Sequence, residues 1–188
     1  MKTLLTLIFA CLLSSSVLAR DIAGVNVANT TTLHGGTTPL ILNGAGIRSK
    51  FIFDIYVGAL YLPSKATTVD AVLAEAGPKR VSMHFLYDEV DKDKLTDGWR
   101  EGFENNLDPA RFKQLEPALN QFNGLFRTVH KGDVIELDFQ PGHGTQVWFN
   151  NELQGSVTAE NFYPALLLVW LGKDPADEDL KEAMLGHD

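Results

Sequence analysis

The sequence predicts an α+β fold in which an antiparallel sheet carries helices on one face. The segment Phe51–Leu62 is apolar in both alternating rows, which is typical of a central strand covered on both sides. Two amphipathic helices follow in the middle of the chain, and a meander of short strands follows them. The turns of this meander, Pro141–Gly144 and Asn150–Asn151, suit hairpins and therefore antiparallel pairing.

The N-terminal half of the predicted sheet comes from four segments. Residues Arg20–Thr38 are polar and predict a short edge strand followed by a loop. Pro39–Ile47 and Lys50–Leu62 predict two strands joined by a turn around Arg48–Ser49. In Arg80–Tyr87 apolar residues alternate with polar ones, which indicates a half-buried strand with His84 on the polar row, in a solvated or edge position.

The helices are predicted from capping residues and from apolar periodicity. Thr67 or Thr68 can cap a short helix at Val69–Ala76, and Asp108–Pro109 is a strong start signal for a longer one. Two apolar stripes mark the central helices: Leu95, Trp99, Phe103 and Leu107, then Phe112, Leu115, Leu119, Phe122 and Phe126. Gly98 and Gly102 are expected to let the first of these helices approach a neighbour closely.

The C-terminal part predicts three strands and two helices. The strands are Asp133–Phe139, Thr145–Phe149 and Glu152–Val157. Thr158 is expected to cap an almost entirely apolar helix that ends at Gly172, and Asp174–Pro175 to start a last short helix.

The first 19 residues have the pattern of a secretory signal. Lys2 precedes the apolar run Leu4–Leu13, and Val17–Leu18–Ala19 forms a small-residue cleavage site. A retained anchor or a lipidated Cys11 are the alternatives, but the run is shorter than the ~20 residues that span a bilayer. Cleavage would leave residues 20–188 as a single domain, periplasmic or secreted, without a stable membrane span.

Composition limits the partners of this domain. The formal net charge is -8, which disfavours nucleic acid and anionic lipid as partners. The single cysteine, Cys11, lies in the predicted signal, so the processed chain would have neither a disulfide nor a thiolate metal site. The five histidines do not pair at metal-ligand spacing, and we assign no metal and no cofactor. The oligomeric state is left open.

Several segments resemble the chalcone isomerase family, and in particular its exported bacterial chalcone isomerase-like members. The resemblance rests on five elements in the same order along the chain: Gly44–Arg48 with Leu60–Leu62, Arg80–Met83, Lys94–Asp97, Gly142–Thr145 and Leu171–Pro175. It implies the open-faced β-sandwich of that family.

Arg48 and Tyr56 are the candidate head-group ligands. From the residues alone, Arg48 is more simply a turn arginine that contacts a neighbouring carboxylate, and Tyr56 a core tyrosine. The resemblance favours a different role, because the family's ligand-binding arginine falls at Arg48. Fatty-acid-binding members of the superfamily hold a carboxylate with an arginine and a tyrosine, and Arg48 with Tyr56 is similar to that pair.

The resemblance also implies that flavonoid isomerisation is inefficient here. The plant enzymes carry a threonine at the position of Tyr56, and a tyrosine and an asparagine at those of Asp91 and Gly98. We therefore expect a non-catalytic binder of a small amphipathic acid such as a fatty acid, with no catalytic residues. Arg48 and Tyr56 would hold its head group, while Trp99 and Phe103 would wall its tail.

Two alternatives stay open at this point. One is an intramolecular lyase or isomerase acting on an unknown ketone or enone, with Arg48 polarising the carbonyl. The other is a scaffold protein whose cleft is filled by its own side chains.

Overall fold

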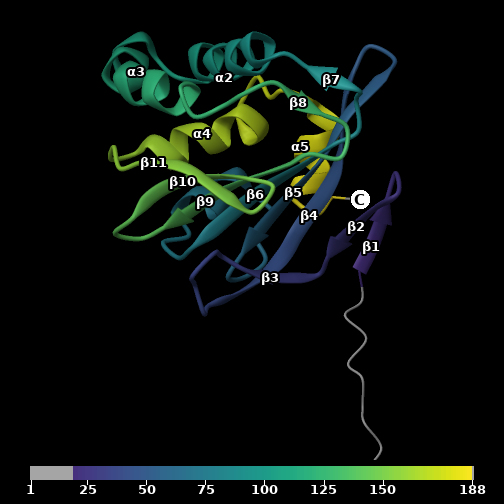
Figure 1. Ribbon diagram of the computed structural model, residues 1–188. Helices are drawn as coiled ribbons and strands as arrows, with labels where there is room; N and C mark the ends of the chain where they lie inside the picture. The colour runs from purple at the N-terminus through teal and green to yellow at the C-terminus, as the bar shows by residue number, and fades with distance from the viewer. Residues whose placement is uncertain (1–18, 188) are drawn as a thin grey trace, which may run out of the picture.

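A curled seven-stranded antiparallel sheet forms one layer of the molecule, and the helices cover one of its faces (Figure 1). The computed structural model describes residues 19–187, so nearly all of the predicted signal lies outside the described residues. From edge to edge the strands are β11 (Glu152–Val157), β10 (Gly144–Phe149), β9 (Val134–Gln140), β6 (Lys79–Phe85), β5 (Phe53–Leu62), β4 (Pro39–Lys50) and β3 (Thr30–Thr32). This architecture confirms the predicted α+β fold.

Two small two-stranded sheets stand outside the main sheet. The first is a hairpin of β1 (Ala19–Ile22) and β2 (Val25–Ala28), and the second pairs β7 (Glu89–Val90) with β8 (Val129–His130), which the two central helices separate along the chain. The sequence predicted neither, because strands of two to four residues carry too few positions to show an alternating pattern.

The hairpin of β4 and β5 turns at Phe51–Ile52 and not at Arg48–Ser49, which corrects the prediction. Lys50 pairs with Phe53, and Arg48 lies inside β4 directly opposite Tyr56. Ser49 continues the strand, and its backbone N–H donates to the Asp177 carboxylate at 2.9 Å. Polar residues therefore extend the strand, while the turn itself is apolar and gave no turn signal.

A β-bulge in β5 lies next to Arg48. The register passes from Arg48–Tyr56 to Ser49–Asp54, so Ile55 has no partner in β4. Alternation alone would place Ile55 and Tyr56 on opposite faces, but both belong to the apolar cluster beneath the helices. The bulge thus adds a second side chain to the helix-covered face at this end of the sheet.

Five helices lie on the same face of the sheet: α1 (Val69–Ala74), α2 (Lys92–Asn106), α3 (Pro109–Asn123), α4 (Phe162–Leu171) and α5 (Glu178–Met184). The predicted caps Thr68 and Asp108 are confirmed by side-chain bonds to the first turns of α1 and α3. No helix within residues 19–187 is long and apolar enough to span a membrane.

The last two helices begin later than predicted. Asn161, at φ 60°, precedes α4 in place of Thr158, and Asp177 caps α5 in place of Asp174. The Asp177 side chain accepts from the Leu180 N–H at 2.9 Å and also from Ser49. It is held from two sides, and so it fixes the start of α5 against β4.

Helix α5 rests directly on β4 because that strand presents glycines to it. A Cβ on Gly44 would lie 1.9 Å from the Ala183 carbonyl oxygen, and one on Gly46 would lie 2.7 Å from the Ala183 Cβ. The next residue on this face of β4 is Arg48. The glycines therefore seat α5, and Arg48 lies just beyond the N-terminal start of that helix.

The opposite face of the sheet is covered by the N-terminal segment. Val27 and Leu33 pack there against Val57, Ala59 and Tyr61 of β5, so β5 is apolar on both faces as predicted. His84 also lies on this face, but in the central strand β6 and half-buried, which corrects its predicted solvated or edge position. Burial lowers the pKa of His84 below its ordinary value.

Candidate functional site

Arg48 has no acidic partner in the part of the chain that the structure describes. Its Nε is buried without a hydrogen-bond partner, and its guanidinium carbon lies 5.6 Å from the centre of the Tyr56 ring. A surface turn arginine paired with a carboxylate does not fit this environment. A buried donor without an acceptor costs about 1–3 kcal/mol, so this position favours a molecule that supplies an acceptor.

Tyr56 lies beneath that guanidinium and is almost fully buried. Its hydroxyl accepts a hydrogen bond from the Trp170 Nε1 at 2.8 Å. Burial raises the pKa of Tyr56 above its ordinary value, against a smaller opposite effect of Arg48. The phenol is therefore protonated at neutral pH. Because Trp170 already donates to the oxygen, the proton of Tyr56 is available to another acceptor.

Trp99 supplies a second buried donor without a partner. Its indole Nε1 has no hydrogen-bond acceptor among the described residues. Its ring packs edge-on against Trp170, with ring centres 5.5 Å apart, and against Phe122 at 5.8 Å. The indole is thus held in one orientation by neighbouring rings.

Three adjoining hollows meet at this place, and Arg48 and Gly98 line all of them. The inner hollow has a volume of about 50 Å³ and is lined by Tyr56, Trp99 and mostly apolar side chains. The polar hollow, of about 230 Å³, lies between β4, α2 and the segment before α5. The outer hollow, of about 430 Å³, runs toward the β4–β5 turn.

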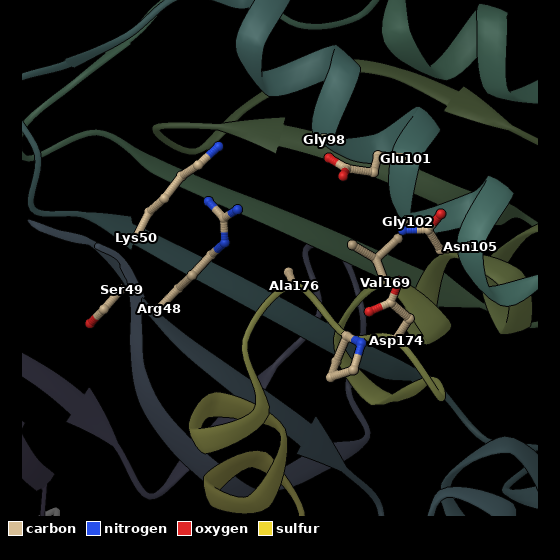
Figure 2. A pocket seen from close by; sticks show the side chains of 11 residues that line it. Arg48, Ser49, Lys50, Gly98, Glu101, Gly102, Asn105, Val169, Asp174 and Ala176 are labelled. Carbon is tan, nitrogen blue, oxygen red and sulfur yellow. The ribbon is translucent and has the colours of Figure 1, made fainter. Parts of the chain in front are cut away.

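Charged side chains face one another across the polar hollow. Figure 2 shows Arg48 and Lys50 extending from β4 toward α2, with Glu101 on the helix opposite. Asp174 lines the hollow from the segment that precedes α5. The β4 side of the polar hollow is therefore cationic, and the side formed by α2 and the Asp174 segment is acidic.

The two glycines of α2 have different roles. A Cβ on Gly102 would lie 2.8 Å from a Val169 methyl, which confirms the expected close approach to α4. A Cβ on Gly98 would meet nothing within 4 Å. Gly98 therefore keeps space open at the junction of the three hollows and does not bring α2 closer to a neighbour.

Phe103 lies deeper than the other predicted site residues. It is fully buried and packs on the Phe162 ring, with centres 5.5 Å apart. It lines none of the three hollows, because the rings behind Trp99 fill the space. The structure thus brings Arg48, Tyr56 and Trp99 together and places Phe103 in the core.

The model of the chalcone isomerase-like family matches residues 19–186. The chain belongs to the chalcone isomerase-like family. Among solved structures, a fatty-acid binding protein of Arabidopsis thaliana is similar to this family member, with a TM-score of 0.69. The similarity covers 89% of this chain and 95% of that chain at 17% sequence identity, which shows a shared fold. None of the curated proteins searched matches the sequence.

In this chalcone isomerase-like protein, Asp91 stands outside the hollows. It precedes α2, pairs with Lys94 at 3.4 Å and is exposed. Lys50, Glu101 and Trp170 also belong to the site or support it, and no motif in the sequence indicates any of the three. Trp170 is 114 residues from Tyr56 along the chain, and no local pattern links the two.

Proposed function

We propose that this protein is a non-catalytic binder of a small amphipathic acid such as a fatty acid. The observation that carries the proposal is an excess of donors around one cavity. Arg48 Nε, Trp99 Nε1 and the Tyr56 hydroxyl, which itself accepts from Trp170, belong to residues that line the inner hollow, and none of them has an acceptor among residues 19–187. A carboxylate supplies acceptor oxygens and a charge opposite to that of Arg48, and such charge-assisted bonds are strong in a dry site.

The sizes of the hollows set the orientation of the proposed ligand. The inner hollow, at about 50 Å³, is far below the roughly 300–1,000 Å³ of small-molecule pockets, so it accepts a head group only. The outer hollow provides about 430 Å³ and carries Phe53, Ile55 and Val90 on its wall. The alkyl tail would lie there, and Trp99 would contact the end next to the carboxylate.

One further observation supports a binding role. The structurally similar plant protein is a fatty-acid binding protein, which is consistent with a small-molecule ligand. The signal pattern of residues 1–19 supports an extracytoplasmic location for this binder, in the periplasm or outside the cell.

The experiment is a calorimetric titration of delipidated protein with dodecanoate. Arg48→Ala should bind at least about tenfold more weakly, because it removes the charge that the carboxylate would neutralise. Glu101→Gln should bind more tightly, since it removes a negative charge from the opposite wall. Arg127→Ala is the matched control, because the Arg127 guanidinium stacks on Phe149 outside the hollows. Equal affinity of Arg48→Ala and the wild type would exclude the proposed anchor.

A further inference from the structure

The tip of the β4–β5 hairpin exposes large apolar side chains. Phe51 is 92% exposed and Ile52 is 89% exposed, while Phe53 packs edge-on against Tyr87 with ring centres 5.4 Å apart. Apart from Leu153 on β11, these four are the only strongly exposed large hydrophobic side chains within residues 19–187. They gather at one end of the molecule, where a contiguous apolar patch indicates contact with a partner or a membrane.

The fold does not require apolar residues at this turn. Phe51 has φ 58°, a backbone conformation that suits glycine or asparagine and that strains a bulky side chain. Ile52 is not among the positive-φ residues, and two-residue hairpin turns of this kind favour glycine at the first central position. Phe51 and Ile52 also bury little surface in the folded chain, so their hydrophobicity contributes little to its stability. A role outside the fold accounts for both features.

Shape and size favour a bilayer as the partner. The tip projects past the sheet beside β7 (Figure 1), and a protruding turn is too small for the standard interface of about 1,200–2,000 Å². Lys50 adjoins Phe51, while the acid Asp54 lies further along β5 and accepts from the Ser49 hydroxyl at 2.9 Å. The turn residues 50–53 themselves carry no acid, so the Lys50 ammonium can contact the phosphate layer of a membrane.

We infer that the hairpin tip, Lys50–Phe53 together with Tyr87, docks on the surface of a lipid bilayer. Phe51 and Ile52 would enter the boundary between head groups and acyl chains, while the Lys50 ammonium would stay at the level of the phosphates. The outer hollow shares Lys50, Phe51, Phe53 and Tyr87 with the tip, so its mouth would face the membrane. Passage of a fatty acid between the membrane and the outer hollow rests on the proposed function. Docking of the tip on a bilayer does not depend on that function.

The test is cosedimentation of the purified protein with vesicles of phosphatidylcholine, a zwitterionic lipid that does not repel a protein of net charge -8. The decisive variant is Phe51→Gly/Ile52→Asn, which places glycine at the one turn position with positive φ and so keeps the fold. Its vesicle affinity should fall by at least about tenfold, because two apolar side chains no longer leave water. Leu153→Ser is the matched control, since Leu153 is 50% exposed on the distant strand β11 and should not change binding.

Three results would overturn the inference: no sedimentation of the wild type, unchanged sedimentation of the Phe51→Gly/Ile52→Asn variant, or an equal loss in Leu153→Ser. The melting temperature of the Phe51→Gly/Ile52→Asn variant should match or exceed that of the wild type, which shows that its hairpin is intact. The vesicles contain no free fatty acid, so failure here leaves the dodecanoate affinity and its dependence on Arg48 unaffected. Failure of the dodecanoate titration likewise leaves docking intact.

Discussion

Gly98 is the residue on which the open space of the site depends. Because a Cβ there meets nothing within 4 Å, Gly98→Ala should stabilise α2 by roughly 0.5–1 kcal/mol and preserve dodecanoate binding. Gly98→Leu should also fold, but its side chain would project into the junction of the three hollows and weaken binding strongly. Thermal unfolding and calorimetry measure the two effects separately.

Gly98→Ala is the control for the larger substitution, since it tests the glycine without filling the site. Unimpaired binding by Gly98→Leu would mean that the acid does not occupy the hollows beside Arg48. Loss of binding in Gly98→Ala would instead mean that the glycine acts through the backbone of α2.

At the scale of single residues, the resemblance predicted Arg48 and Tyr56, which the structure brings together as cross-strand neighbours. Residue types alone favoured a surface arginine, because burial without an acidic partner leaves no local signal. The bond from Trp170 to Tyr56 could not be predicted, since it depends on how α4 lies across the sheet. Phe103 was predicted to line the site because it shares an apolar helix stripe with Trp99. Helical spacing alone cannot tell an aromatic side chain in the core from one that lines a cavity.

Among the elements, the contact of α5 with β4 holds the segment that lines the polar hollow. Gly44→Ala would place its Cβ 1.9 Å from the Ala183 carbonyl oxygen, so α5 must move outward. We expect a loss of about 1–3 kcal/mol in the free energy of unfolding, the usual cost of overpacking. Denaturant titration measures this loss of stability. Gly98→Ala is the control, because the structure has space for a Cβ at Gly98. An unchanged stability would contradict this close seating of α5 on β4.

The elements themselves were largely predictable, and their junctions were not. Apolar alternation located β5 and β6, and the caps Thr68 and Asp108 located α1 and α3. The β4–β5 turn was misplaced because Arg48–Ser49 is polar while the true turn, Phe51–Ile52, is apolar. The bulge at Ile55 has no signature in the sequence, although it decides which side chains line the inner hollow.

At the scale of the whole molecule, the hollows lie at the end of the helix layer where α2 and the start of α5 face the β4–β5 hairpin. Elsewhere between helices and sheet, aromatic rings such as Phe103, Phe122 and Phe162 fill the core. The same end carries the apolar tip, so the inner hollow, the outer hollow and the proposed membrane contact follow one another along the β4–β5 hairpin. The family fold provides the sheet and the helices that cover it. Arg48 and Tyr56 on this hairpin determine which head group the proposed ligand carries.

The central claim is that a carboxylate is held by Arg48, and comparing dodecanoate with dodecanol tests it most directly. The two share an alkyl chain, so displacement of a fluorescent fatty-acid probe isolates the head group. We predict that dodecanoate binds the wild type at least about tenfold more tightly than dodecanol, and that Arg48→Ala abolishes the difference. Equal affinities of acid and alcohol for the wild type would contradict the account.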